Sequence, residues 1–415
     1  MPERPPLLSL DDALQRLLAV AAQHVIADTQ SVDTFDALGR VLAEAVRSAL
    51  DVPPADNSSM DGYALRAADA AQAGALLPVS QRIAAGSVGH VLQPGTAARI
   101  FTGAQIPDGA DTVVMQEACE AVPGDGLGAV RIVAPPAIGA WIRRRGEDVR
   151  QGATVLTQGT RLTPQALGLA ASVGAPALAV VRRPRVALFS TGDELVMPGQ
   201  PLKPGAIYNS NRFMLRALLQ ASGCAVTDLG IVPDQLQATR DALRTAARGH
   251  DLILSSGGVS VGEEDHLRPA VQAEGRLELW QIAIKPGKPL AFGEVSNGIA
   301  QPALFIGLPG NPVSSFVTYL LAVAPVLKAL QGADARMPKA LPVRADFDWP
   351  KADRRREFLR VRVNEQGGLE LFGNQSSGVL TSAVWADGLV DNPGGQVIRR
   401  GDAVGFLPMA GLVMR

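Results

Sequence analysis

The chain has 415 residues, of which 47% are hydrophobic and 4% aromatic, and its formal net charge at pH 7 is −1. A chain of this length exceeds one hydrophobic core and predicts roughly two to four domains, while its charge and aromatic content exclude a basic stripe or a stacking platform for nucleic acid. Its 2 cysteines and 4 histidines lack the spacing of zinc or iron–sulfur sites, so we expect any metal to be a hard, oxygen-liganded ion.

The first six residues, Met-Pro-Glu-Arg-Pro-Pro, lack the basic and apolar regions of a signal peptide. The longest apolar run, 316–330, falls short of the roughly 20 residues of a membrane helix and predicts a core helix instead. We therefore expect a cytoplasmic protein with no membrane partner and no nucleic-acid partner.

In chain order, the first predicted element is a helix from Leu10 to Ala22. Residues 48–151 are rich in glycine and proline, and their short β-type runs predict a small β domain; these runs are 79–84, 97–101, 112–116 and 130–133. Residues 184–330 alternate strand, loop and helix, which predicts a mainly parallel sheet with right-handed crossovers. Its strands are expected at 186–190, 225–231, 252–255 and 303–308, and its helices at 211–222, 235–248 and 316–330. Beyond Pro338, alternating runs at 358–363 and 369–372 predict a second β domain.

The loop at 255–266, Ser-Ser-Gly-Gly-Val-Ser-Val-Gly-Glu-Glu-Asp-His, follows a short apolar strand. It is neither a Walker A motif nor a Gly-x-Gly-x-x-Gly motif. It offers backbone N–H groups, a hydroxyl and a carboxylate that suit a phosphorylated ligand and Mg²⁺; the residues are Gly257, Gly258, Gly262, Ser260 and Asp265. A tight strand-to-helix turn would explain this loop equally well if it stood alone.

Two similar loops follow other predicted strands. One is Ser190-Thr-Gly-Asp-Glu194, and the other begins at Pro309 and leads past Ser314 into the apolar helix. Because the carboxyl ends of neighbouring parallel strands meet at one edge, the three loops should line a shared crevice. Asp234 follows a further strand at this edge, where a helix N-cap is the simpler explanation, although both roles can coexist.

Lys285 and Lys288 lie in the segment Lys-Pro-Gly-Lys-Pro, in which each lysine precedes a proline. Proline fixes φ and stiffens the segment, so the two ammonium groups lose little entropy on binding an oxyanion. A solvated basic turn is the alternative interpretation.

Together, ordered motifs over nearly the whole chain resemble the molybdopterin molybdenumtransferases, which include the bacterial MoeA proteins and the E domain of gephyrin. The motifs are Asp56-Asn-Ser-Ser-Met-Asp-Gly-Tyr-Ala, Arg99-Ile-Phe-Thr-Gly-Ala, Arg145-Gly-Glu-Asp148, Ser190-Thr-Gly-Asp-Glu-Leu, Gly257-Gly-Val-Ser-Val-Gly, Lys285-Pro-Gly-Lys-Pro and Leu308-Pro-Gly-Asn-Pro-Val-Ser. The resemblance implies an enzyme that uses adenylylated molybdopterin and molybdate, cleaves the phosphoanhydride, releases AMP and leaves the molybdenum cofactor.

The resemblance also implies a fold and its domain limits. A three-layer α/β domain of the molybdopterin-binding type would comprise residues 1–25 and 184–332. A connecting domain would comprise 26–47 and 152–183, a β-rich domain 48–151, and a C-terminal β domain 338–415. The first helix is assigned to the α/β domain by the resemblance alone.

By similarity, the substrate site should include Gly257, Gly258, Ser260, Lys285, Lys288, Pro309, Ser314, Arg355 and Ser377. Glu194, Asp234 and Asp265 should hold Mg²⁺ or position the anhydride. Arg354 and Arg356 flank Arg355, so the register of this triplet is open, and a solvated charge run is its simpler interpretation.

Asp56, Thr102 and Asp148 match family positions associated with activity, although they are far in sequence from the sheet. The homodimer of the family would explain this, because one subunit can close over the crevice of its partner. The local alternatives are an Asx-type turn at Asp56 and an ion pair of Asp148 with Arg144 or Arg145.

The resemblance leaves two other functions open: the adenylyltransferase of the preceding step, whose loop reads Gly-Gly-Thr-Gly, and a non-catalytic scaffold like part of gephyrin. The expected partners are that adenylyltransferase and downstream molybdoenzymes or nucleotide transferases. One departure from the family is Gln281, where a lysine is expected after the tryptophan, so one cationic contact would be missing or replaced.

Overall fold

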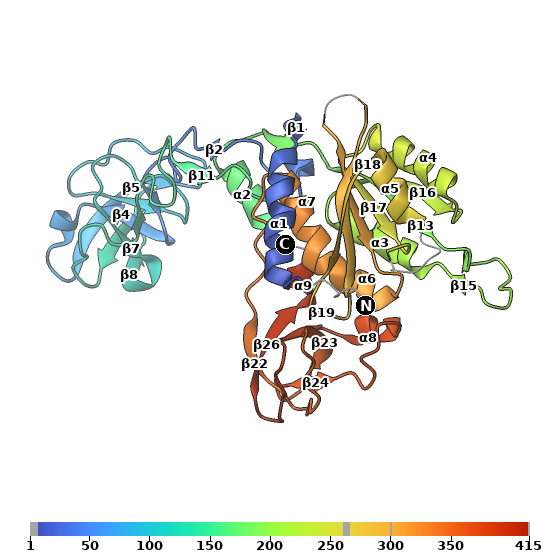
Figure 1. Ribbon diagram of the computed structural model, residues 1–415. Coiled ribbons are helices and arrows are strands. Elements are labelled where there is room, and N and C mark those ends of the chain that lie inside the picture. The colour runs from blue at the N-terminus through green and yellow to red at the C-terminus, as the bar shows by residue number, and fades with distance from the viewer. Residues whose placement is uncertain (1–6, 260–265, 299–300, 414–415) are drawn as a thin grey trace.

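The computed structural model describes residues 7–259, 266–298 and 301–413. Within these ranges, three six-stranded sheets lie in three lobes of the molecule (Figure 1). The lobe with β4 to β9 stands apart, and the other two lobes are in contact.

The central sheet has the strand order β16-β13-β17-β21-β20-β18. Four of its strands are parallel neighbours, namely β13 (Arg185–Thr191), β16 (Ala225–Val232), β17 (Leu252–Ser256) and β21 (Ala303–Leu308). This confirms the mainly parallel sheet expected from the apolar runs, which are buried on both faces. The sequence did not predict the antiparallel edge formed by β18 (Gly275–Gln281) and β20 (Pro289–Val295).

Helices cover both faces of the central sheet, so the lobe has three layers. One core cluster joins the sheet to α1 (Leu10–Ala21), α3 (Ser210–Ala221), α6 (Pro312–Thr318) and α7 (Ala324–Leu330). A second cluster joins the other face to α4 (Leu236–Ala247) and α5 (Leu267–Glu274).

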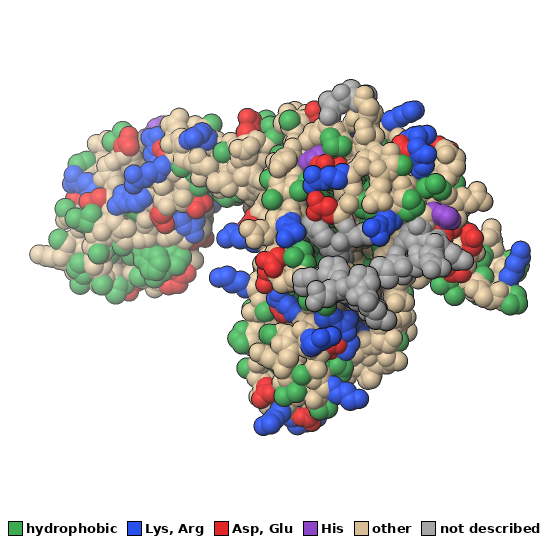
Figure 2. Space-filling model, in the orientation of Figure 1, with side chains coloured by type: hydrophobic (Ala, Val, Ile, Leu, Met, Phe, Trp, Pro, Cys, Tyr) green, Lys and Arg blue, Asp and Glu red, His purple; other side chains and the backbone are tan. Residues whose placement is uncertain are grey.

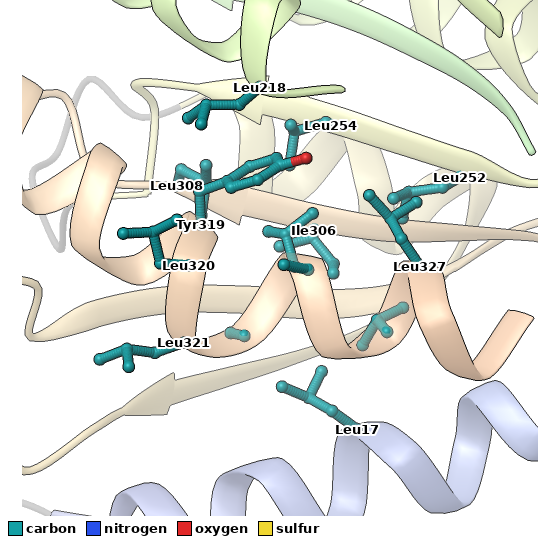
Figure 3. Close-up of a cluster of buried hydrophobic side chains, with 14 of the residues drawn as sticks. Leu17, Leu218, Leu252, Leu254, Ile306, Leu308, Tyr319, Leu320, Leu321 and Leu327 are labelled. Atoms are coloured by element: carbon teal, nitrogen blue, oxygen red, sulfur yellow. The ribbon is translucent and has the colours of Figure 1, made fainter. Parts of the chain in front are cut away.

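The helical stretch over Pro312–Leu330 contains a π-helical turn at Tyr319–Val323. By length and composition it could cross a membrane, with a mean hydropathy of 1.7, but 83% of its most apolar window is buried inside the protein. Figure 3 shows Leu17 of α1 below this stretch and side chains of the sheet beside it; these are Leu252, Leu254, Ile306 and Leu308. The Tyr319 hydroxyl lies 2.8 Å from Ser222 Oγ, which satisfies its polar end within the core.

The separate lobe is built on a sheet of order β7-β4-β6-β5-β9-β8. Its strands are β4 (Gly62–Leu65), β5 (Ala75–Ile83), β6 (Ala97–Ile100), β7 (Thr112–Met115), β8 (Cys119–Val122) and β9 (Ala129–Ile132). A short pair, β3 (Asn57–Ser58) and β10 (Ile142–Arg143), lies beside this sheet.

Two strand pairs and a helix connect this lobe to the central one (Figure 1). They are β1 (Thr29–Asp33) with β12 (Ala177–Val181), β2 (Val46–Arg47) with β11 (Thr154–Leu156), and α2 (Pro164–Ser172). A small core of their apolar side chains lies between them.

The C-terminal lobe has a sheet of order β19-β23-β25-β26-β22, with β24 paired to β23. Its elements are β22 (Leu341–Arg344), β23 (Arg356–Val363), β24 (Leu369–Leu371), α8 (Leu380–Trp385), β25 (Gly388–Asn392), β26 (Ala403–Pro408) and α9 (Met409–Val413). Its edge strand β19 (Ile284–Lys285) comes from the central part of the chain and pairs in parallel with β23. The segment that carries Lys285 is therefore built into the C-terminal sheet.

Candidate active site

The loops predicted from sequence meet at the carboxyl edge of the central sheet. Ser190 of β13 is in register with Ser256 of β17, and Ser256 is in register with Leu308 of β21. On the other side of β13, Thr191 is in register with Val232 of β16. The loops after these strands therefore begin at one edge, as expected for a shared crevice.

Gly257 and Gly258 have φ values of 90° and 67°, in the left-handed region that favours glycine. A Cβ at Gly257 would lie 2.6 Å from the Thr191 carbonyl oxygen, and one at Gly258 would lie 2.8 Å from Thr191 Oγ1. Only glycine allows this loop to lie so close to the end of β13. The other predicted residues of the loop, Ser260, Gly262 and Asp265, lie outside the described residues.

Asn211 of α3 joins the end of β17 to the loop after β21, a role that the sequence did not suggest. Its Nδ2 donates to Ser256 Oγ at 2.8 Å and to the Gly310 carbonyl at 2.7 Å. The preceding Asn209 caps α3 by accepting from the Arg212 amide at 3.1 Å, as its position before the helix predicted. The spacing Asn-Ser-Asn was the available signal, because only one of the two asparagines can cap the helix.

Several buried polar atoms near this edge have no hydrogen-bond partner among the described residues. They are Ser190 Oγ, Ser255 Oγ, Asn209 Nδ2, Asn211 Oδ1 and Thr318 Oγ1. Buried polar groups in proteins are nearly always hydrogen-bonded, so these atoms leave capacity for water or ligand at the edge.

The carboxylates predicted to hold Mg²⁺ are only partly within the described residues. Glu194 is exposed in the loop after β13, and Asp234 is half-buried after β16. The N-cap of α4 is Gln235, so the N-cap interpretation of Asp234 is wrong by one residue. Asp265 is outside the described ranges, and within them no group of three or more His, Cys, Asp or Glu residues is arranged to hold a metal.

Lys285 is anchored to a buried carboxylate of the C-terminal sheet. Its Nζ donates to Glu357 Oε1 at 2.9 Å, and the Glu357 side chain is 1% exposed. The other carboxylate oxygen, Oε2, accepts from Trp349 Nε1 at 2.7 Å and Asn392 Nδ2 at 3.4 Å. Because each oxygen has a partner, Glu357 holds the Lys285 ammonium in one direction.

Two members of the arginine triplet are ion-paired and half-buried, whereas Arg354 is exposed. Arg355 donates through Nε and Nη2 to the two oxygens of Asp353, at 3.0 and 2.8 Å, and this hydrogen-bonded guanidinium lowers the pKa of Asp353. Arg356 instead makes a bidentate pair with Asp391 of β25. Asp353 Oδ2 also lies 3.5 Å from Lys285 Nζ, so Arg355 is the member of the triplet that shares a carboxylate with Lys285.

Lys288 is half-buried, and no ion pair joins it to a described residue. The loop that holds Ser377 contacts the start of α6, where the Val313 amide donates to the Ser377 carbonyl at 2.9 Å. Ser314 follows Val313 in α6 and is buried, as is Pro309. The C-terminal loop and the start of α6 are therefore in contact, as a site that includes both Ser314 and Ser377 requires.

Arg360 of β23 holds this C-terminal loop, a role missed from the sequence. Its guanidinium is buried and donates to the Ser376 and Phe358 carbonyls and to Ser382 Oγ. Burial lowers the pKa of Arg360 to about 10, which leaves it charged at neutral pH. The signal was an arginine among the apolar residues of a strand that is predicted to face a core.

Asp56, Thr102 and Asp148 lie in the separate lobe, away from the central sheet (Figure 1). Thr102 donates through its amide and hydroxyl to Asp61 Oδ1, at 2.8 and 2.7 Å. Asp56 accepts from the Arg145 amide and from Arg144 Nη1. Partial burial raises the pKa of Asp56, but these hydrogen bonds outweigh that effect and lower it.

The predicted local partner of Asp148 is wrong. Arg144 pairs with Asp56 at 2.7 Å, and Arg145 pairs with Asp51 at 2.6 Å. Asp148 is exposed, and among the described residues it makes no ion pair with either arginine. Its carboxylate is therefore accessible at the surface of the separate lobe.

The charges of the molecule are mixed in sign. Figure 2 shows Lys and Arg side chains interspersed with Asp and Glu on the visible face, with no single basic stripe. This agrees with the net charge of −1 and gives no support for a nucleic-acid partner.

Comparison with known proteins identifies the family. Residues 8–174 match the family described as MoeA N-terminal region (domain I and II), residues 187–329 match a probable molybdopterin binding domain, and residues 342–409 match the MoeA C-terminal region (domain IV). The molybdopterin molybdenumtransferase of Haemophilus influenzae is 39% identical over 383 residues, covering 91% of this chain and 92% of that protein. The chain belongs to the MoeA family of molybdopterin molybdenumtransferases.

Other molybdopterin molybdenumtransferases and MoeA structures agree over a similar extent. The relative from Nostoc is 38% identical over 381 residues, or 89% of this chain and 86% of that protein. The crystal structure of the molybdopterin biosynthesis MoeA protein from Pyrococcus horikoshii has a TM-score of 0.81 and 30% identity, and it covers 97% of this chain and 99% of its own. The multidomain α/β and β architecture is thus that of the MoeA family.

Proposed function

We propose that this chain is a molybdopterin molybdenumtransferase that uses molybdate to insert molybdenum into adenylylated molybdopterin, with hydrolysis of the phosphoanhydride and release of AMP. Membership of the MoeA family supports molybdenum insertion during cofactor biosynthesis. The observation that supports the detailed reaction best is the pairing of β19 with β23. This pairing places Lys285, from the central part of the chain, beside Arg355 of the C-terminal lobe.

In this proposal the oxyanion binds where the two sheets meet. Lys285 and Arg355 share Asp353, and Lys288 follows Lys285 in the same turn. A tetrahedral dianion needs rigid cationic and hydroxyl donors, which these residues and the hydroxyls of Ser314, Ser377 and Ser260 would supply. The N–H group of Gly258, beside the Pro309 loop, would bind the phosphate part of the substrate, whereas the Gly257 amide donates to the Leu308 carbonyl at 3.1 Å and holds the loop beside β21.

The described carboxylates fit a hard cation. Glu194 and Asp234 follow β13 and β16, whose ends are in register, and carboxylate oxygens are ligands that Mg²⁺ prefers. With Asp265 they would hold Mg²⁺, which would offset the negative charge of the phosphoanhydride. Asp234 and Glu194 are the residues to test first, because both lie at the described edge.

A homodimer is part of the same proposal. Asp56, Thr102 and Asp148 belong to a lobe that lies apart from the sheet of its own chain, so a site that uses them needs a second copy. The β-rich domain of one subunit would then close over the crevice of its partner. We place the enzyme in the cytoplasm, between the adenylyltransferase that supplies its substrate and the molybdoenzymes or nucleotide transferases that receive its product.

The test is to incubate the purified protein with adenylylated molybdopterin and Mg²⁺, with and without molybdate, and to follow AMP release. The proposal predicts that AMP release depends on molybdate. Intact substrate in both tubes would contradict the proposal. Consumption of ATP with free molybdopterin would then indicate the adenylyltransferase, and no reaction with either substrate would indicate a scaffold.

A further inference from the structure

Asp353 occupies the place between two proposed substrate cations. Its two oxygens accept from Arg355 Nε and Nη2 at 3.0 and 2.8 Å, and its Oδ2 lies 3.5 Å from Lys285 Nζ. A carboxylate in this position presents paired oxygens to the same donors that would bind an oxyanion. Resident carboxylate and substrate oxyanion therefore cannot both use these donors.

The two carboxylates beside Lys285 differ in burial and in their hydrogen bonds. The Glu357 side chain is 1% exposed; its Oε1 accepts from Lys285, and its Oε2 accepts from Trp349 and Asn392 of the C-terminal lobe. The Asp353 side chain is 22% exposed, and it accepts hydrogen bonds from the amide and guanidinium of Arg355 beside its contact with Lys285. Glu357 is thus fixed in place, whereas Asp353 can turn toward solvent.

The Asp353 side chain can turn toward solvent without a movement of its backbone. The Asp353 carbonyl accepts from the Gly395 amide at 2.7 Å, which anchors the main chain. A rotation of the side chain alone would free Arg355, and rotamer changes of partly exposed side chains are fast. Arg355 lowers the pKa of Asp353, so the carboxylate stays charged at neutral pH and protonation does not vacate the position.

We propose that Asp353 is an internal counter-ion that substrate oxyanion displaces from Arg355 and Lys285. This inference rests on the proposed function of those two cations. Only an anion that attracts the two cations more strongly than the Asp353 carboxylate does can displace it. A dianion meets this condition because it carries twice the charge, whereas chloride, with a single charge, does not. Asp353 thereby favours the binding of molybdate-like dianions over that of monovalent anions such as chloride.

The test is calorimetric titration of the full chain with sodium molybdate, comparing wild type with Asp353→Asn. Asparagine keeps the shape and an acceptor for the Arg355 amide but removes the competing charge. We expect Asp353→Asn to bind molybdate at least about fivefold more tightly. We also expect chloride to compete with molybdate more effectively in the variant than in wild type.

The chain offers a matched control. Asp334 accepts from the Arg336 amide at 3.0 Å and from its Nε at 2.9 Å, the same two-residue pairing, on the surface and outside the site. Asp334→Asn should leave molybdate affinity unchanged. Thermal unfolding of each variant confirms that the fold is intact, and Asp353→Ser replaces the asparagine variant if that one does not fold.

Equal or weaker binding by Asp353→Asn would overturn the inference, because it would mean that Asp353 merely positions Arg355. The same gain in Asp334→Asn would overturn it too, because the effect would then be one of net charge. Absence of molybdate binding by wild type is a different result, since it removes the proposed oxyanion site itself.

Discussion

The Lys285 ammonium lies 2.9 Å from a carboxylate oxygen of Glu357, and this pair joins a segment of the central chain to the C-terminal sheet. The pairing of β19 with β23 brings the two residues into register. A site for an oxyanion is thereby assembled from two parts of the chain that are about 70 residues apart in sequence.

Glu357→Gln should loosen this junction. The amide keeps the shape but places a donor against either Lys285 or Trp349, and we expect a loss of about 1–3 kcal/mol in the free energy of unfolding. Molybdate affinity should fall as well, opposite in sign to the change expected for Asp353→Asn. Calorimetric titration and thermal unfolding measure both effects, and an unchanged affinity would argue against a positioning role for Glu357.

Replacement of Lys285 and replacement of Lys288 should differ in their effects on protein stability. Lys285→Ala and Lys288→Ala should each weaken molybdate binding, because each removes a cation from the proposed site. Only Lys285→Ala leaves a buried carboxylate without its ion pair, so only this variant should also lower the melting temperature. Molybdate titrations that show wild-type affinity in either variant would remove that lysine from the site.

Gly258→Ala should disrupt the loop at the end of β17. Its φ of 67° disfavours a side chain, and a Cβ would lie 2.8 Å from Thr191 Oγ1. The expected cost is about 1–3 kcal/mol, with loss of substrate binding, since the N–H groups of the loop would shift. Gly249→Ala is the control, because no atom lies within 4 Å of its added Cβ. Equal activity of the two variants would show that the loop tolerates a shift.

A shared site across a dimer predicts complementation. Asp56→Ala and Lys288→Ala are each expected to be inactive alone, because each removes one half of the site. Random mixing of the two chains should restore about one quarter of wild-type activity, since half the dimers would be mixed and each of these would keep one intact site. Mixed dimers with no activity would place both residues in the same subunit's site, and an active Asp56→Ala variant would place Asp56 outside the site.

Leu17→Ala should weaken the docking of α1 on the central lobe. Leu17 is fully buried against the helical stretch beside β21, and removing such a side chain costs about 2–5 kcal/mol. Urea unfolding measures the change, and Gln15→Ala, on the exposed side of α1, is the control. A loss as small as that of the control would mean that α1 contributes little to this core.

The central sheet could be predicted because its apolar runs end at glycine-rich loops and alternate with helical segments. The common edge of the loops after β13, β17 and β21 followed from the expectation that these strands are parallel neighbours, which their pairing confirms. The antiparallel strands β18 and β20 were missed because the prolines around Lys285 indicate a rigid turn and are disfavoured within strands.

The counter-ions of the site could not be predicted. Asp353 is two residues from Arg355, a spacing that also occurs in the surface pair Asp334–Arg336 and carries no information on location. Glu357 reaches Lys285 only through pairing between distant strands, which a single sequence does not specify. Ser260 and Asp265 stay predictions, because they are outside the described residues.

The most direct measurement of the central claim is the amount of molybdenum retained in the pterin product for each AMP released from adenylylated molybdopterin. Molybdenum insertion coupled to hydrolysis predicts one molybdenum for each AMP, with neither product formed when molybdate is omitted. AMP released at the same rate without molybdate, with no metal in the product, would show a hydrolase that does not insert molybdenum and would contradict the account.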